Sequence, residues 1–161
     1  AFGGHPPHAM RIRLEPANQP EVLALIDALD AHQKPLYPPE SHHGIDVQAL
    51  SQPEVLFAVV RSETGVAVAC GAVVLGEHWG ELKRMFVQPA LRRRGISRHL
   101  LAFLEHEAFE RGCGLLMLET GIRQPEAIGL YQNAGYQRRG PFGDYAEDPL
   151  SVFMQKRLTP P

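Results

Sequence analysis

The sequence predicts one domain of the mixed α/β class. The chain of 161 residues fits the usual size of a single domain, and strand-like alternation and helix-like periodicity follow each other along it. It contains no internal repeat, no low-complexity tract and no Pro/Gly-rich linker between two periodic regions. We therefore expect one layered arrangement of strands and helices around a common core.

The N-terminal part is predicted to form one strand and two helices. Alternation in residues 10–14 is typical of a half-buried strand, which Pro16 ends. Apolar residues recur at helical spacing over 22–29 and predict a first helix. Three prolines keep residues 34–44 irregular, and a short helix is expected after them, near 46–50.

Three consecutive strands are predicted next, and they form an antiparallel meander. β-branched runs at 55–61 and 66–75 flank the turn sequence S-E-T-G, which favours a tight hairpin. A second turn at 76–80 leads into a strand at 81–87, and Pro89 ends that strand.

The C-terminal part is predicted to alternate helices with strands. Apolar residues between 100 and 108 recur at helical spacing and predict a helix that ends near Arg111. The elements expected after it are a buried strand at 115–119, a helix at 125–131 that Gly135 caps, a strand beginning there and a last strand at 151–158.

The composition excludes several classes of protein. Hydrophobic residues make up 44% and charged residues 21% of the chain, which excludes collagen-like, coiled-coil and wholly disordered chains. A net charge of -2 is unsuited to coating nucleic acid or an anionic membrane, so any anion site must be local. The longest apolar run, residues 66–75, has about half of the roughly 20 residues that a membrane-spanning helix needs.

The start of the chain and its two cysteines indicate the cellular compartment in which the protein is expected. Residues 1–9 precede a methionine and carry no periodicity, so we expect a cloning remnant or a disordered segment there, with Met10 as the natural start of a domain at 10–161. No secretory signal pattern opens the chain, and Cys70 and Cys113 form no disulfide framework. A cytoplasmic protein with reduced cysteines is therefore expected.

A basic segment after the third meander strand is the candidate anion site. Between Leu82 and Arg98 there are six basic residues and no acidic residue, in a chain that is acidic overall. The sequence R-R-R-G-I-S at 92–97 joins a strand to a helix, so backbone N–H groups and the positive end of the helix dipole converge there. Gly95 lets a ligand approach the backbone closely. A solvated basic turn is the alternative, while the Walker and dinucleotide-binding patterns are absent.

This segment resembles the R-x-x-G-x-[GA] acetyl-coenzyme A loop of the GNAT superfamily of N-acetyltransferases. Arg92 and Gly95 match that pattern, and Ser97 departs from it. A second segment, Q-P-E-A-I-G-L-Y-Q-N-A-G-Y at 124–136, is similar to the superfamily pattern N-x-x-A-x-x-L-Y-x-x-x-G-F, from which Gln124 departs. The sequence Y-P-P-E-S at 37–41 also looks like a group of small bacterial members. The expected element order from 10 to 158 is that of the superfamily.

The resemblance implies a fold and a cofactor. The fold is a mostly antiparallel mixed sheet of about seven strands flanked by about four helices, in the order β-α-α-β-β-β-α-β-α-β-β. The fourth strand should diverge from the fifth and pair with the amide groups of acetyl-coenzyme A, the acyl donor. The residues implied in cofactor binding are Met85, Phe86, Val87, Arg92, Arg93, Arg94, Gly95, Ile96, Ser97, Arg98, Gln124, Ala127 and Tyr131.

The resemblance also implies catalytic residues. Tyr131 is expected to donate a proton to the leaving thiolate. Glu81 is expected to act as a general base, with an ion pair to Lys83 or Arg84 as the alternative. No metal is expected, because His42 and His43 lack a third ligand and helical spacing.

The expected function is direct acetyl transfer to the primary amine of a small molecule. Loops that flank the end of the cofactor supply candidate substrate-binding residues: Tyr37, Glu40, His42, His43, Arg123, Asp144 and Tyr145. Arg123 would suit the carboxylate of an amino acid or a related acid. Alternatives are a protein lysine or N-terminal acetyltransferase, a non-catalytic acyl-coenzyme A sensor, and a nucleic-acid patch at 92–94. We expect no nucleic-acid or membrane partner, and a monomer or homodimer.

Overall fold

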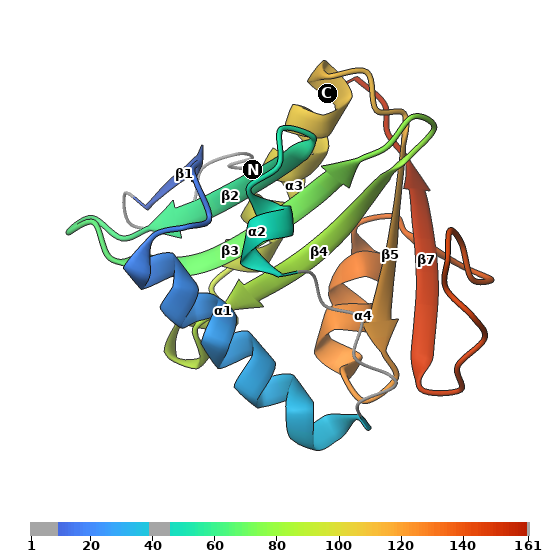
Figure 1. Ribbon diagram of the computed structural model, residues 1–161, viewed down its shortest axis with the longest axis horizontal. Coiled ribbons are helices and arrows are strands. Elements are labelled where there is room, and N and C mark those ends of the chain that lie inside the picture. The colour runs from blue at the N-terminus through green and yellow to red at the C-terminus, as the bar shows by residue number, and fades with distance from the viewer. Residues whose placement is uncertain (1–9, 39–45, 161) are drawn as a thin grey trace.

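The computed structural model describes residues 10–38 and 46–160, which form a seven-stranded sheet with helices on both faces (Figure 1). The sheet order is β1-β2-β3-β4-β5-β7-β6, and every pair is antiparallel except β4 with β5. The strands are β1 (Arg11–Leu14), β2 (Val55–Arg61), β3 (Ala67–Leu75), β4 (Gly80–Val87), β5 (Leu115–Gly121), β6 (Gln137–Arg139) and β7 (Ser151–Arg157). The mixed class, the strand number and the element order confirm the predicted fold.

The helices also follow the predicted order, with one local difference. They are α1 (Pro20–Gln33), η1 (Lys34–Leu36), α2 (Val47–Leu50), η3 (Pro89–Leu91), α3 (Ile96–Glu110) and α4 (Pro125–Asn133). The prediction that 34–44 is irregular throughout is wrong at its start, where the chain forms the 3-10 turn η1. Pro35 lies in the first turn of η1, where a missing N–H costs no hydrogen bond and its fixed φ suits a helical turn.

Two hydrophobic clusters hold the helices against opposite faces of the sheet. Helices α1 and α2 lie in front of the sheet in Figure 1, and α3 lies behind it. The apolar stripe over 22–29 is buried as its spacing predicted, and it packs with Leu50 of α2 against one face. On the other face, Leu100 and Leu104 of α3 share a cluster with Tyr131 of α4. Both cysteines are free thiols and buried.

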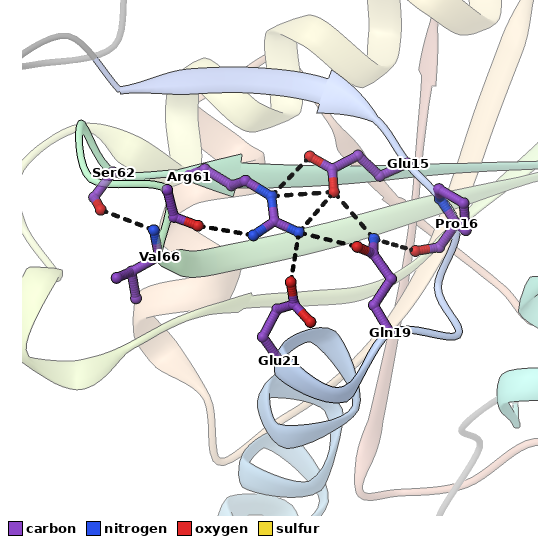
Figure 2. Close-up of polar contacts among 8 residues, drawn as sticks. Glu15, Pro16, Gln19, Glu21, Arg61, Ser62 and Val66 are labelled. Atoms are coloured by element: carbon purple, nitrogen blue, oxygen red, sulfur yellow. Dashed lines mark hydrogen bonds and ion pairs between the residues drawn. The ribbon is translucent and has the colours of Figure 1, made fainter.

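The start of α1 is fixed to the end of β2 by one arginine (Figure 2). Arg61 donates to both carboxylate oxygens of Glu15, and its Nη2 also donates to Gln19 and Glu21 at 3.2 and 3.1 Å. The hydrogen bonds from Arg61 lower the pKa of Glu15. This network connects the β1–α1 link to the sheet and so sets the position of the helix over it.

Strands β4 and β5 are paired over only three positions and then diverge. Gly80, Glu81 and Leu82 face residues 116–118, and beyond Leu82 the strands have no shared register. Figure 1 shows the two arrows separating toward their C-terminal ends. Beyond Leu82, β4 therefore has no strand neighbour among the described residues on the side of β5, a divergence that the resemblance implied.

No helix in the described parts of the chain is long and apolar enough to cross a membrane.

Candidate active site

A cavity of about 100 Å³ lies where β4 and β5 diverge. Its walls come from α1, Tyr37 after η1, β4, β5, α4 and the loop before β7. The polar residues that line it are Gln33, Tyr37, Glu81, Lys83, Arg84, Glu119, Thr120, Gln124, Tyr131 and Tyr145. Segments that are far apart in sequence thus place two carboxylates, two cations and three tyrosines around one small volume.

A bulge in β4 decides where Arg84 points. The register between β3 and β4 shifts between Cys70 and Ala72, and Arg84 has a φ of 60°. Strict alternation would place Arg84 on the face of Leu82, inside the core, where an unpaired charge is costly. The extra residue instead turns the guanidinium toward α1, where it pairs with Asp30 and lines the cavity.

Glu81 is held by a tyrosine and a lysine. The Tyr145 hydroxyl donates to Oε2 of Glu81 at 2.5 Å, and Nζ of Lys83 lies 3.3 Å from the same oxygen. Lys83 also donates to the Tyr145 hydroxyl oxygen at 3.0 Å. The ion pair with Lys83 was one of the two interpretations that the sequence left open, whereas Arg84 pairs with Asp30 instead.

Tyr145 is fixed by an aromatic cluster. Its ring makes edge contacts with Phe142 and Phe153, at centroid distances of 5.0 and 5.4 Å. Its backbone N–H donates to the carbonyl of Phe142. Burial raises the pKa of Tyr145, and the hydrogen bond to Glu81 raises it further, so the phenol stays protonated at neutral pH.

Tyr131 on α4 is a buried phenol that faces the cavity. It is 6% exposed and makes an edge contact with the ring of Tyr136 at 5.7 Å. Burial raises the pKa of Tyr131, and the Glu119 carboxylate adds to this effect. No described residue forms a hydrogen bond with its hydroxyl, which leaves that group available to a ligand.

The predicted core stripe of α4 is rotated relative to the observed one. Helical spacing from Pro125 predicts a core stripe with Ala127, Leu130 and Ala134 at its centre and Tyr131 on its border. In the structure Ile128 and Tyr131 are the buried residues of α4, and the three predicted positions are only partly buried. The helix presents Ile128 and Tyr131 because the core beneath it is the cluster shared with α3 and β5.

Tyr37 closes one end of the cavity against β5. A Cβ at Gly121 would overlap the Tyr37 hydroxyl, so only glycine allows the phenol to lie this close to the strand. The hydroxyl accepts from the backbone N–H of Arg123 at 3.1 Å and lies 3.4 Å from Oε1 of Gln124. Burial raises the pKa of Tyr37.

The Arg123 side chain is exposed and lies outside the cavity lining. Its Nη1 donates to the carbonyl oxygen of Leu36 at 3.0 Å. The guanidinium therefore ties the β5–α4 turn to η1.

The basic segment forms the predicted loop at the start of α3. Gly95 is the N-cap residue with a left-handed φ of 80°, and Arg93 has a φ of 66°. The first helical hydrogen bond runs from the N–H of His99 to the carbonyl of Gly95. The N–H groups of residues 96–98 have no acceptor in the described parts of the chain, as expected for the first turn of a helix.

The arginines of this loop are not equivalent. Nε of Arg92 donates to the carbonyl of Val87 at 3.1 Å, and its guanidinium lies over the ring of Phe86 at 5.7 Å. Arg92 thus holds the loop to the end of β4. In contrast, Arg93, Arg94 and Arg98 are all exposed.

The structure brings together some of the predicted site residues and separates others. Met85, Gln124 and Ala127 line the cavity together with Glu81, Tyr131, Tyr37 and Tyr145. The side chains of Phe86 and Val87 are buried in the core, so only their backbone groups can contact a ligand. Asp144 is exposed outside the lining, and Glu40, His42 and His43 lie outside the described residues. Within the described ranges, no group of three or more metal-binding side chains is present.

The sequence prediction missed Glu119 and did not give Lys83 or Arg84 a place in the site. Glu119 accepts a hydrogen bond from the Ser151 hydroxyl at 2.7 Å and faces the cavity. Alternation in β5 does place Glu119 on the face of Gly121. The divergence of β5 from β4 decides whether that face packs in the core or lines the cavity. No local sequence pattern predicts this divergence.

The fold and the site define an acyltransferase, and the comparisons with known proteins agree. The sequence pattern of the "Acetyltransferase (GNAT) family" matches residues 25–136, so the chain belongs to this family. It is 46% identical to the "IAA acetyltransferase" of Azospirillum brasilense over 142 residues, which cover 87% of this chain and 92% of that protein.

Solved structures share the fold over almost the whole chain. A crystal structure from Klebsiella pneumoniae, assigned as an acyl-CoA N-acyltransferase, is 41% identical with a TM-score of 0.81 and covers 94% of this chain and 99% of that one. An aminoglycoside 6'-N-acetyltransferase in complex with coenzyme A has a TM-score of 0.69 at 19% identity, covering 94% and 98% of the two chains. At 19% identity, the similarity to the aminoglycoside 6'-N-acetyltransferase shows a shared fold only.

Proposed function

We propose that the protein transfers the acetyl group of acetyl-coenzyme A directly to the primary amine of a small molecule. One observation carries this proposal: the divergence of β4 and β5 places the Glu81 carboxylate and the Tyr131 hydroxyl on the wall of one small cavity. A base for the amine and an acid for the thiolate are the two proton-transfer groups that this reaction uses.

The residues present fit the donor. The free N–H groups of 96–98, the close approach allowed by Gly95 and the arginines around them suit a pyrophosphate. The space beside β4 beyond Leu82, where β5 has diverged, suits an extended arm that carries amides. That arm would lead from the loop toward the cavity, where the thioester would supply the acetyl group.

Two side chains move the protons. Glu81 accepts a proton from the acceptor ammonium, directly or through a water, so that the neutral amine attacks the thioester carbonyl. Tyr131 donates its phenolic proton as the C–S bond breaks, and the thiol leaves neutral. The attacking nitrogen gives its second proton to the phenolate, which leaves a neutral amide and restores Tyr131. The raised pKa of Tyr131 keeps this donor protonated until the thiolate, a strong acceptor, develops.

The cavity favours a small acceptor. Its volume of about 100 Å³ and its walls at Tyr37 and Tyr145 suit a compact amine better than a polypeptide in an open groove. Arg123, whose backbone N–H donates to the cavity-lining Tyr37, supports an acceptor that carries a carboxylate, such as an amino acid or a related acid. The relative named "IAA acetyltransferase" is consistent with a small-molecule acceptor.

Thiol release from acetyl-coenzyme A tests the proposal. A panel of small amines and amino acids is compared with lysine-containing peptides at equal concentration. Release with one or more small amines, above the rate of thioester hydrolysis, is the expected result. Binding of coenzyme A with no release for any acceptor would instead indicate a sensor, and release with peptides alone a protein acetyltransferase.

The role of Arg123 is tested with acceptor pairs. An amino acid and its decarboxylated amine are compared as acceptors for the unmodified protein and for Arg123→Lys. Lysine keeps the positive charge but lacks the paired N–H groups with which a guanidinium binds both oxygens of a carboxylate. We expect KM for the amino acid to rise in the variant and KM for the amine to stay the same. Equal turnover of both acceptors by the unmodified protein would remove this role.

A further inference from the structure

We propose that Tyr145 is a positioning residue, which fixes the Glu81 carboxylate so that Oε1 is presented to the acceptor amine. This inference rests on the proposed function, because it assigns a task to the base of that reaction. Tyr145 reaches Glu81 from the loop before β7, 64 residues away in sequence.

The two carboxylate oxygens of Glu81 have different contacts. The hydroxyl of Tyr145 and the ammonium of Lys83 both lie against Oε2, at 2.5 and 3.3 Å. Oε1 forms no hydrogen bond or ion pair with any residue that the structure describes. Because Glu81 lines the cavity, Oε1 is the oxygen left to accept a proton there.

The hydrogen bonds around Glu81 all run toward its carboxylate. Lys83 donates to the Tyr145 oxygen, and Tyr145 donates to Glu81. Both partners are donors, so Oε2 is the acceptor in each of these contacts, and they fix its position.

Tyr145 supplies a geometric restraint that Lys83 does not. A lysine ammonium is a point charge on a flexible chain, and its attraction fixes a carboxylate in distance more than in orientation. The Tyr145 ring is locked between Phe142 and Phe153, so its hydroxyl has a set position relative to β4. Catalytic groups need this kind of support from their neighbours, since a shift of about 1 Å can cost a factor of 10² in rate.

The chain contains a matched arrangement away from the cavity. Tyr136 donates to Oε2 of Glu105 at 2.8 Å, and Nζ of Lys156 lies 2.9 Å from the other oxygen of that carboxylate. The lysine lies over the tyrosine ring at 5.7 Å here and at 5.6 Å in the Tyr145 site. None of these three residues lines the cavity, so Tyr136→Phe is a control that removes the same kind of hydrogen bond.

The experiment is a double-mutant cycle on kcat, measured with saturating acetyl-coenzyme A and the best acceptor of the panel. The proteins compared are the unmodified chain, Tyr145→Phe, Glu81→Gln, the double variant and the control Tyr136→Phe. Phenylalanine keeps the ring contacts of Tyr145, and coenzyme A affinity by calorimetry reports whether each variant is folded.

We expect Tyr145→Phe to lower kcat at least tenfold, with coenzyme A affinity unchanged and kcat of Tyr136→Phe within twofold of the unmodified chain. In the Glu81→Gln background, the same change should alter kcat less than threefold, because its effect passes through Glu81.

Three outcomes would overturn the inference. Equal losses in both backgrounds would mean that Tyr145 acts independently of Glu81, for example by contacting the acceptor. A kcat of Tyr145→Phe within threefold of the unmodified chain would mean that the hydroxyl is not needed to position the base. Absence of thiol release by the unmodified chain with every acceptor would overturn the proposed function, and this inference with it. This outcome is measured on the unmodified chain alone, before any variant is made, so it is distinguished from the first two outcomes.

Discussion

Leu82 of β4 and Leu118 of β5 form the last pair at which these two parallel strands are neighbours. Directly beyond this pair, the side chains of Lys83, Arg84 and Glu119 line a cavity instead of a continuous sheet surface. The bulge at Arg84 lies at the same point, so the change in strand direction and the opening of the site have one local origin.

Gly95→Asp should abolish specific binding of coenzyme A. A Cβ at this position lies 3.4 Å from the end of the Arg98 side chain, so the fold accommodates it, at a backbone cost of about 1–2 kcal/mol for the left-handed φ. The new carboxylate would compete with phosphate for the N–H groups of 96–98. Calorimetry should show coenzyme A affinity at least tenfold weaker.

Gly112→Asp is the matched control for that variant. Gly112 also has a left-handed φ, of 87°, and no atom lies within 4 Å of a Cβ added there. The whole of α3 separates this position from the loop. Its coenzyme A affinity should equal that of the unmodified chain. Unchanged affinity in a folded Gly95→Asp protein would exclude the loop as the binding site.

Glu81→Gln should lower kcat by a factor of about 10²–10⁴ at neutral pH. The loss should shrink as pH rises, because the acceptor amine then loses its proton to solvent without help from a base. A pH series of kcat/KM measures both effects, with Glu105→Gln as the control at the matched carboxylate. A change below threefold across the series would leave Glu81 as the ion-pair partner of Lys83 only.

Tyr131→Phe should lower kcat at least tenfold with little effect on coenzyme A affinity. The hydroxyl has no hydrogen-bond partner among the described residues, so its loss leaves no buried group unpaired and the fold should be retained. Steady-state kinetics and calorimetry separate the two quantities, and Tyr136→Phe controls for the adjacent ring. Full activity of the folded variant would exclude Tyr131 as the acid.

Gly121→Ala should displace Tyr37 and lower the free energy of unfolding by about 1–3 kcal/mol, because the methyl group overlaps the phenol. In a Tyr37→Ala background, the same substitution should cost almost nothing. Gly129→Ala is the control: the position lies within α4 with open space around it, and the change should stabilise the helix by about 0.5–1 kcal/mol. Urea denaturation measures the unmodified chain and the four variants, and equal losses at Gly121 in both backgrounds would contradict the predicted overlap.

Stability should fall above pH 10. Burial raises the pKa of Tyr131, Tyr136 and Tyr145 above the ordinary value of about 10, so the unfolded chain loses these protons first. The folded state then binds more protons than the unfolded state, and the free energy of unfolding decreases with pH, by up to about 1.4 kcal/mol per pH unit for each tyrosine. Urea denaturation between pH 8 and 11 checks this.

Tyr136→Phe provides the comparison for the alkaline series. Removing one buried phenol should make the slope of the free energy of unfolding against pH less steep, by the contribution of one tyrosine. A decrease of the same slope in both proteins would show that Tyr136 does not contribute.

Elements with a local cause were predictable from the sequence. The stripe over 22–29 became the buried face of α1, the run at 55–61 became β2 with the same bounds, and Gly95 stands at the start of α3 with a positive φ. Periodicity, turn residues and a glycine in a left-handed conformation depend on neighbours within a few positions, so the sequence records them directly. The same holds for the spacing that places Tyr131 on α4.

The sequence by itself thus determined the order of the elements, the family pattern and the glycine loop at the start of α3. Only the tertiary structure decided which side chains share the cavity: the partner of Glu81 comes from residue 145, Tyr37 lies against Gly121, and the bulge turns Arg84 toward Asp30. These contacts join segments more than 50 residues apart, so they follow from how the strands and loops pack together, and no short stretch of sequence carries that information.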